Sequence, residues 1–373
     1  MQENIPPSER GRHGYRSLFW PIILIGAGIV WLLFNLGIIP PEGFSVLFRL
    51  WPLILIVIGL DIIFGRQSAV LGALIGLAAV AVMVAAMIVG PSRGWAGPAR
   101  FFGVPVTLGS AEVVTDQIAE PLGEAVSAEI RLDLSQWPAR VYPLSGSVNL
   151  IEAEIVRFAN QPPILDVSGT RNRSLRLGVR DGFNFIGLDF VSQTREWSIG
   201  LSPAVPINLT VDVSSGRAVL DLNGLNLTAL TINGGSGRTE LTLPGAGRPY
   251  SAYIDVSSGS FQIDIPTGAQ VDIEVDGGSG SLDMAIAEVA SVNASIDGGS
   301  GSITFDVPDQ AAVRVIVLDS GSGSVNLSGL RQVDNGGDND DDTGTWETAG
   351  FSNSPNPIIL IFEDLGSGSV TVR

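Results

Sequence analysis

The sequence lacks several residue types on which common protein chemistries depend. Its 373 residues include no cysteine, which excludes disulfides, cysteine-ligated zinc and thiol nucleophiles. They include no lysine either, which excludes Schiff-base chemistry and the lysine of a nucleotide-binding loop. The single histidine, His13, lies near the N-terminus. The main body of the chain therefore has no histidine for a catalytic triad or a metal site.

Charge is divided unevenly along the chain. Residues 1–100 carry a net charge of +3, whereas residues 101–373 carry a net charge of −20. A strongly acidic domain repels nucleic acid, so we expect no nucleic-acid binding. The same charge attracts cations or basic partners, and it also keeps an exposed domain soluble.

The first hundred residues contain three long apolar segments, over residues 18–39, 46–64 and 69–89. About 20 apolar residues span a bilayer, so we expect a cytoplasmic arm over 1–16 and a region of three transmembrane helices over 17–90. Arg49 and Asp61 lie near the ends of the second segment, where their side chains can reach the lipid headgroups.

Arginines beside the helices favour an N-terminus inside the cell. With three spans, the rest of the chain would then lie outside the cytoplasmic membrane.

A glycine-containing turn recurs seven times in the second half of the chain. Each copy has Ser before a final Gly, and Asp or Asn four residues before that Gly. The first and last residues of the copies are Asp212 and Gly216, Asn233 and Gly237, Asp255 and Gly259, Asp276 and Gly280, Asp297 and Gly301, Asp319 and Gly323, and Asp364 and Gly368. Consecutive copies lie 21 or 22 residues apart, except for a last step of 45. A fixed period of this length is typical of a stacked repeat fold.

Apolar and polar residues alternate after each turn. Phe261, Ile263 and Ile265, for example, alternate with Gln262 and Asp264. This period of two predicts half-buried strands, and a second such strand precedes each turn. Each repeat is therefore predicted to be a rung of two strands, with the Ser-Gly turn at one corner. Rungs stacked about 4.8 Å apart would form an all-β solenoid, similar to a β-helix, around an aliphatic core.

The repeat divides the rest of the chain into predicted regions. We expect a linker over 91–125, irregular β rungs over 126–206 and the regular β-solenoid over 207–373. The long last step places an insertion at 331–356 that is rich in Asp, Asn and Gly. We interpret this insertion as an exposed, mobile, acidic loop.

The recurring turns favour a structural role over ligand binding. A phosphate-binding loop occurs once and opens a helix, whereas these turns recur and are followed by strands. We expect Gly to adopt the left-handed backbone angle, and Asp, Asn and Ser to accept hydrogen bonds from turn amides. Stacking would align the acidic residues in a column, where neighbours repel by roughly 1 kcal/mol per pair in water-like surroundings. Those hydrogen bonds, or calcium bound between rungs, would offset the repulsion.

The insertion offers a second, weaker calcium candidate. Asp338, Asp340 and Asp342 alternate as in a calcium-binding loop. Thr343 and Ala349, however, stand where such a loop has Gly and Glu, so a solvated loop is the simpler interpretation. The acidic residues of the repeats fall on repeat positions and form no unique cluster. We therefore expect no enzymatic activity, and keep a carbohydrate-cleaving β-helix enzyme as the catalytic alternative.

Two parts of the chain resemble known bacterial proteins. Phe19-Trp-Pro-Ile-Ile-Leu-Ile-Gly26 and Leu50-Trp-Pro-Leu-Ile-Leu-Ile-Val-Ile-Gly-Leu60 resemble the paired membrane helices of LiaI/LiaF-like proteins. Trp197-Ser-Ile-Gly-Leu-Ser-Pro-Ala-Val-Pro-Ile-Asn-Leu209, followed by Leu220-Asp-Leu-Asn-Gly-Leu225, resembles the toast-rack and adhesin-like β domains often attached to such helices. LiaF is an accessory regulator that restrains a sensor kinase in the response to cell-wall antibiotics. The resemblance thus implies a role in envelope stress or at the cell surface.

These observations predict a multi-pass protein of the bacterial cytoplasmic membrane with an extracytoplasmic β domain and no cofactor. The leading hypothesis is a non-catalytic protein that senses or regulates envelope stress through protein–protein contacts. A membrane sensor kinase, or another envelope protein, would be its partner. The alternative is a surface adhesin or scaffold that binds partners, or associates with itself, along the solenoid.

Overall fold

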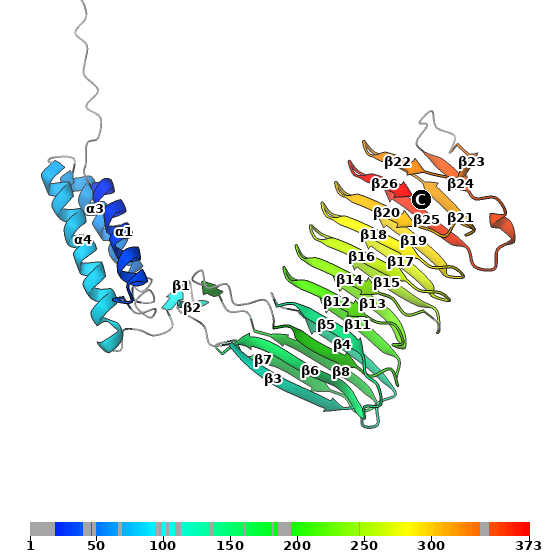
Figure 1. The fold of residues 1–373 in the computed structure, drawn as a ribbon, viewed down its shortest axis with the longest axis horizontal. Helices are drawn as coiled ribbons and strands as arrows, with labels where there is room; N and C mark the ends of the chain where they lie inside the picture. The colour runs from blue at the N-terminus through cyan, green and yellow to red at the C-terminus, as the bar shows by residue number, and fades with distance from the viewer. Residues whose placement is uncertain are drawn as a thin grey trace, which may run out of the picture. The chain divides into compact units, whose positions relative to one another are not determined.

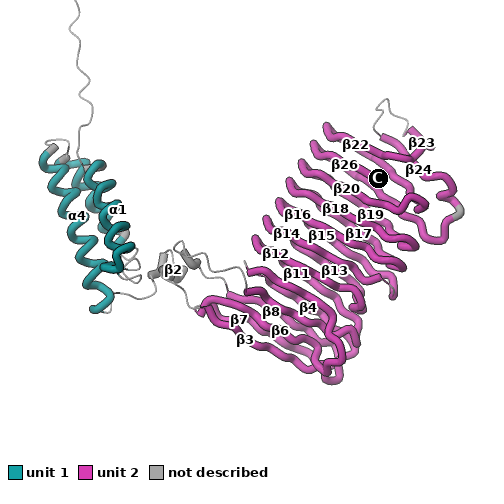
Figure 2. Tube along the Cα trace, viewed as in Figure 1, with its two compact units in different colours: residues 1–112, 181–189 teal, residues 113–180, 190–373 magenta. Residues whose placement is uncertain are grey.

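The computed structural model describes residues 19–39, 46, 50–65, 69–93, 95, 99–101, 104–108, 113–134, 137–159, 161–180, 183–185, 195–245, 247–335 and 343–373. The chain forms two compact units (Figure 2). The first comprises residues 1–112 and 181–189, and the second comprises residues 113–180 and 190–373. The predicted cytoplasmic arm and Arg49 lie outside the described residues.

The first unit is mainly helical (Figure 1). Its helices and helical turns are α1 (Phe19–Asn35), α3 (Trp51–Leu60), the π-helical turn η1 (Asp61–Gly65), α4 (Ala69–Val89) and the 3-10 turn η2 (Pro91–Arg93). One of the described helices is long and apolar enough to cross a membrane, over Val70–Val89. Two shorter apolar helices cover Pro21–Asn35 and Pro52–Phe64. A small sheet of β1 (Ala99–Phe101), β2 (Val104–Leu108) and β9 (Phe183–Phe185) completes the unit.

Small residues bring the helices close together. A Cβ placed on Gly26 of α1 would lie 2.4 Å from a methyl carbon of Val80 in α4, so a larger residue would require Val80 to shift. Gly72 and Gly76 of α4 are buried. Small residues at this spacing are typical of packed membrane helices.

Asp61 differs from the sequence-based expectation that its side chain reaches the headgroups. It is only 3% exposed and lies in η1, which packs against α4. Asp61 is the first residue of this π-helical turn, which also contacts α3. Sequence position alone suggested an exposed side chain, because Asp61 lies so near the end of its apolar segment.

The second unit consists of two large mixed sheets that face each other. In spatial order, the eleven-stranded sheet contains β22 (Ser324–Leu327), β26 (Ser369–Val372), β20 (Ser302–Asp306), β18 (Ser281–Ile286), β16 (Ser260–Ile265), β14 (Arg238–Thr242), β12 (Arg217–Asp221), β5 (Ala139–Pro143), β10 (Trp197–Leu201), β6 (Asn149–Phe158) and β3 (Val113–Pro121). The twelve-stranded sheet contains β23 (Arg331–Asp334), β24 (Gly344–Glu347), β21 (Val313–Val317), β25 (Ile358–Asp364), β19 (Ser291–Asp297), β17 (Gln270–Asp276), β15 (Tyr250–Asp255), β13 (Leu227–Asn233), β11 (Ile207–Asp212), β4 (Ser127–Asp133), β8 (Asn172–Val179) and β7 (Pro163–Ser168).

Between β11 and β20 the strands pair in parallel with the strand one repeat away. Ile263 of β16, for example, pairs with Leu241 of β14 and with Met284 of β18. The chain passes from the twelve-stranded to the eleven-stranded sheet at each Ser-Gly turn, and returns at the opposite corner (Figure 1). One repeat therefore adds one strand to each sheet.

The core lies between the two sheets, and the alternation seen in the sequence correctly predicts which residues fill it. Leu220, Ile263 and Met284 from one sheet are at most 1% exposed, and so are Leu230 and Ile254 from the other. Val325 and Leu327 are only half-buried, because β22 is the last strand of its sheet.

The first rungs are less regular than the repeats. β3 begins at Val113, within the predicted linker, and pairs antiparallel with β6 along its length. β10 inserts between β5, to which it is parallel, and β6, to which it is antiparallel. Because β3 is an edge strand, its side chains are only partly buried, and it carries no turn motif to mark it in the sequence.

The C-terminal rungs do not stack in chain order. β25 lies between β19 and β21, and β26 lies between β20 and β22, so the last rung of the chain is the penultimate rung of the stack (Figure 1). The predicted insertion contains β23, β24 and the 3-10 turn η3 (Phe351–Asn353). β24 pairs antiparallel with β21, so these flanks of the insertion extend the sheet rather than forming a loop. Asp338, Asp340 and Asp342 lie outside the described residues.

Candidate functional site: the column of Ser-Gly turns

The Ser-Gly turns stack directly upon one another. A Cβ placed on Gly280 would lie 2.0 Å from the carbonyl oxygen of Gly259, and one on Gly301 would lie 1.9 Å from that of Gly280. Glycine is needed here because the backbones of successive rungs approach closely.

The expectation that the Gly residues of these turns adopt the left-handed backbone angle is wrong for most of them. Within the seven turns that angle occurs only at Ser257, Gly321 and Gly366, with φ of 52°, 56° and 57°. The final Gly of each turn avoids it. Sequence reasoning recognised the need for glycine but assigned it to backbone torsion rather than to contact between rungs.

The Asp and Asn residues that open the turns lie in register. Asn233 pairs with Asp212 and Asp255, and Asp276 pairs with Asp255 and Asp297. The last rung in the chain continues the column, because Asp364 pairs with Asp297. Two of these acids accept hydrogen bonds from their own turns, from the Gly321 amide to Asp319 Oδ1 at 2.8 Å and from the Gly366 amide to Asp364 Oδ1 at 2.7 Å.

An ion-pair network neutralises one end of the column. Arg131 Nη2 lies 2.6 Å from Asp212 Oδ2, and Asn233 Nδ2 donates to Asp212 Oδ1 at 2.5 Å. Asp133 lies in register with Asp212 and binds both Arg131 and Arg176. Burial tends to raise the pKa of Asp133, but its hydrogen bonds with Arg176 and Arg131, together with the charge of Arg176, outweigh burial and hold the pKa below its ordinary value. Asp133 precedes the repeats, so the sequence motif did not identify it.

The middle of the stack is strongly acidic. Between Arg248 and Arg314 the sequence contains ten acidic residues and no arginine. Tyr253 lies among these acids on the outer face of β15. Desolvation, and then the carboxylates of Asp276 and other nearby acids, raise the pKa of its phenol.

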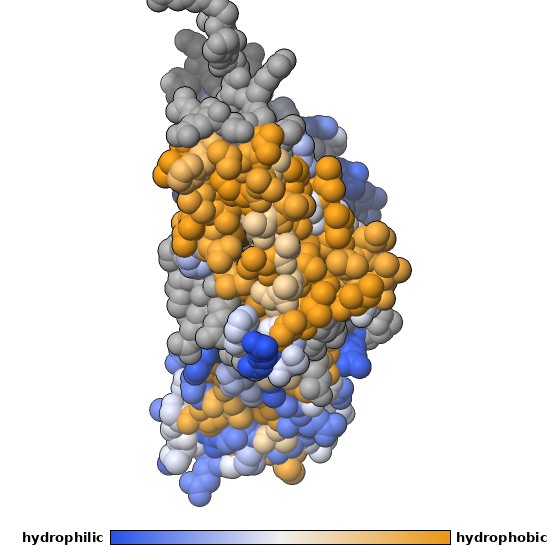
Figure 3. Space-filling model, turned by 90° about the vertical axis from the view of Figure 1, so that its left-hand side faces the viewer, coloured by the Kyte–Doolittle hydropathy of each residue, from blue (hydrophilic) through white to orange (hydrophobic). Residues whose placement is uncertain are grey.

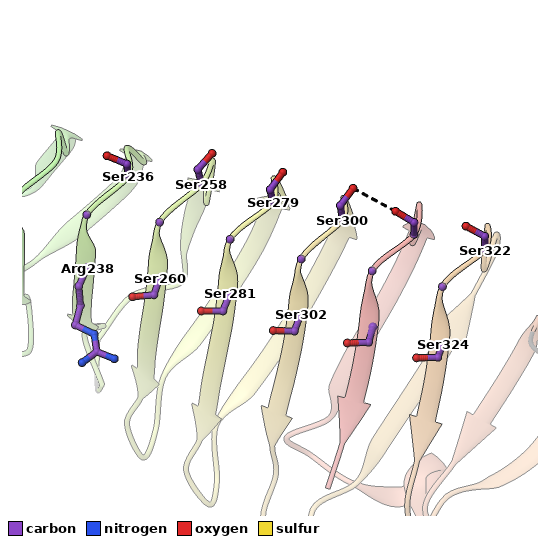
Figure 4. Close-up of a pocket in the computed structure, with 18 residues that line it drawn as sticks. Ser236, Arg238, Ser258, Ser260, Ser279, Ser281, Ser300, Ser302, Ser322 and Ser324 are labelled. Carbon is purple, nitrogen blue, oxygen red and sulfur yellow. Dashed lines mark hydrogen bonds between the residues drawn. The ribbon is translucent and has the colours of Figure 1, made fainter.

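An open groove of about 920 Å³ runs along the turns (Figure 4). Its walls repeat a Ser-Gly-Ser unit, so that one row of serines lies at the turns and a second row opens the strands. Ser367 Oγ donates to Ser300 Oγ at 3.2 Å, which joins two rungs of the first row. Arg238 replaces serine in the second row and adds a cation to the groove.

The groove presents serine hydroxyls that can form hydrogen bonds. A serine nucleophile needs an adjacent base, and residues 113–373 include no histidine or lysine. Among the residues that the structure describes, no group of three or more acidic or histidine side chains could hold a metal ion. The sequence located the turns but not the groove, because serines of successive repeats form continuous rows only when the rungs stack.

Comparisons with known proteins match two regions of the chain. Residues 18–63 match the LiaI-LiaF-like transmembrane region, and residues 127–265 match the N-terminal domain of toast_rack. Both matches confirm the resemblances found in the sequence. No curated protein matches the chain.

Two solved structures are similar over most of their length. One is a candidate cell adhesion protein from Clostridium sporogenes, with 16% identity and a TM-score of 0.36 over 70% of this chain and 99% of that chain. The other is a candidate adhesin from Parabacteroides merdae, with 12% identity and a TM-score of 0.23 over 71% of this chain and 98% of that chain.

Proposed function

We propose that this membrane protein, which contains a LiaI-LiaF-like transmembrane region and a toast_rack N-terminal domain, is a non-catalytic sensor or regulator of the bacterial cell envelope. It crosses the cytoplasmic membrane three times, and its second unit is an extracytoplasmic β-solenoid. It acts by contact with other proteins, and a membrane sensor kinase is the partner that the LiaI-LiaF-like region favours.

The single observation that carries this proposal is the LiaI-LiaF-like match over residues 18–63, which covers α1 and α3. The surface of these helices supports a role in helix contacts. Leu24, Ile25 and Trp31 of α1 are 71%, 63% and 52% exposed, and Leu55 and Ile56 of α3 are 59% and 61% exposed. Figure 3 shows such apolar side chains gathered over the helical unit. These side chains can contact either lipid or the helices of a partner.

An exchange of the membrane region tests this proposal. Residues 1–90 would be replaced by unrelated helices with the same number of spans, and the full chain and the chimera would be expressed at equal levels in the native host. We expect the full chain to co-purify with a sensor kinase after crosslinking, and the chimera to lose both the kinase and its effect on the envelope-stress response. Retention of both by the chimera would contradict a role for the helices.

The serine-lined groove favours a second candidate function, as a surface adhesin or scaffold. Its hydroxyls repeat at the spacing of the rungs and offer many weak hydrogen bonds to an extended ligand such as a glycan strand. Binding of the full chain to cell-wall glycans would be compared with that of a variant in which Ser281 and Ser302 are both changed to Ala. Weaker binding by the variant would support adhesion, and equal binding would argue against the groove.

A further inference from the structure

The last rung of the chain, β25–β26, lies between two earlier rungs, β19–β20 and β21–β22, instead of at the end of the stack. The preceding rung, β21–β22, stacks on β25–β26 and not on β19–β20. We call the space between β19–β20 and β21–β22 the slot, and β25–β26 the C-terminal rung.

Both walls of the slot hold the C-terminal rung by continuous backbone pairing. Leu360 of β25 pairs with Ala294 of β19 on one side and with Val315 of β21 on the other, both in parallel. Ser369 of β26 pairs with Ser302 of β20 and with Ser324 of β22. The slot therefore fits a rung of this register on both sides.

The C-terminal rung also fills the core at this level. Leu360, Phe362 and Val372 are fully buried, and the Phe362 ring lies 5.9 Å from the ring of Phe305 in an edge-on arrangement. Arg373 Nε donates to Asp306 Oδ1 at 2.6 Å and thereby ties the end of the chain to β20. An empty slot would expose this core and four strand edges, so the slot requires an occupant.

The covalent connection to the C-terminal rung is longer than those between the regular rungs. β24, within residues 328–357, pairs with β21 beside the slot, so residues 348–357 join this pair to β25, whereas residues 287–290 join β18 to β19. A connection of this length does not by itself decide which molecule's slot the C-terminal rung enters. The C-terminal rung of a second copy has the same sequence and would form every contact described above.

We propose that the C-terminal rung is exchangeable, and that two copies of this chain associate by inserting their C-terminal rungs into each other's slots. Such an exchange conserves each backbone pair and each core contact, so it costs little once the rungs are released. Anchoring both chains in one membrane raises their local concentration and favours the exchange. The partner is thus a second copy, and the interface is the slot. The inference does not depend on the proposed sensing function.

The absence of cysteine makes a direct test available. Ser302 and Ser369 face each other across β20 and β26, and both are exposed. Neighbouring strands lie about 4.8 Å apart, which is within the range of Cα separations that a disulfide bridges. One full-length copy would carry Ser302→Cys and one tag, and the other would carry Ser369→Cys and a second tag. Both would be expressed together in membranes and oxidised.

Ser281 of β18 provides the matched control, because it pairs with Ser302 in the same column but belongs to the uninterrupted stack. We expect the pair Ser302→Cys and Ser369→Cys to give at least about tenfold more doubly tagged disulfide dimer than the pair Ser281→Cys and Ser302→Cys. Equal yields would overturn the proposal.

A single chain that carries both Ser302→Cys and Ser369→Cys completes the test. We expect it to form the disulfide both within one chain and between chains. A disulfide formed only within one chain would overturn exchange. If no disulfide formed at all, the pairing of β26 with β20, which defines the slot, would be contradicted.

Discussion

At the scale of single residues, one turn uses a strained residue where its neighbour uses glycine. The connections 266–269 and 287–290 each place a left-handed residue third, Gly268 with φ of 80° in one and Val289 with φ of 65° in the other. This conformation costs an L-residue roughly 1–2 kcal/mol, and a β-branched side chain is especially unsuited to it. Val289 is also 61% exposed, so it gains little from burial.

Val289→Gly should therefore stabilise the β unit. The strain that is relieved exceeds the entropy cost of glycine's greater flexibility in the unfolded chain, and the net gain should be about 0.5–1 kcal/mol, or roughly 1–4 °C in Tm. Thermal unfolding of the purified full chain, followed by circular dichroism, measures this gain. The matched variant Gly268→Val should lower Tm. An unchanged or lower Tm for Val289→Gly would show that the turn is not strained.

The network around Asp133 predicts a dependence of stability on pH. Because the pKa of Asp133 is lower in the folded chain than in the unfolded chain, its contribution is fully present above the unfolded value of about 4. The contribution is lost as the pH falls through the folded pKa.

Asp133→Asn should therefore lower the unfolding free energy at pH 7 by about 1 kcal/mol, and should reduce the further loss of stability below pH 4. Urea unfolding at several pH values measures both effects. Glu129→Gln, on the exposed face of the same strand, is the control and should change neither. A loss of stability with Asp133→Asn that stays constant with pH would mean that the carboxylate charge is not responsible.

At the scale of elements, the stacking of rungs depends on close contact between turn backbones. Gly280→Ala places a Cβ 2.0 Å from the Gly259 carbonyl oxygen, and only movement of a rung relieves this contact. We expect a loss of about 1–3 kcal/mol in unfolding free energy, as for other overpacked positions. Gly247→Ala is the control, because a Cβ there meets no atom within 4 Å. Equal stability of the two variants would contradict the close packing of the turns.

Much of the β unit was predictable from local sequence. A period of 21 or 22 residues and the alternation after each turn located the strands from β11 to β20 and their buried residues, such as Ile263. Turn residues and the alternation within strands depend on neighbouring residues, so both can be recognised in the sequence. The apolar segments likewise indicated the helices.

The order of the last rungs was not predictable in the same way. The turns that begin at Asp319 and Asp364 follow the same pattern, so the sequence does not show which of the two rungs stacks on β19–β20. Stacking order depends on contacts between distant residues, such as Phe305 and Phe362. The serine-lined groove was missed for the same reason, because its two rows exist only after stacking.

At the scale of the whole molecule, the two units differ in composition and surface. The helical unit carries the LiaI-LiaF-like region, and the β unit presents an acidic stack with a serine-lined groove. Our proposal requires that the β unit lie outside the cytoplasm, because only there can it meet envelope components or the β units of other surface proteins. The proposed function therefore depends most directly on a β unit that lies outside the cytoplasm.

Single cysteines test this location directly, since the chain has none of its own. Val148 in the β unit is 79% exposed, and Ser8 lies in the predicted cytoplasmic arm. Intact spheroplasts that carry full-length Val148→Cys or Ser8→Cys would be treated with a membrane-impermeant maleimide before and after lysis. We predict labelling of Val148→Cys in intact spheroplasts, and of Ser8→Cys only after lysis. Labelling of Val148→Cys only after lysis would place the β unit in the cytoplasm and contradict its proposed role in the envelope.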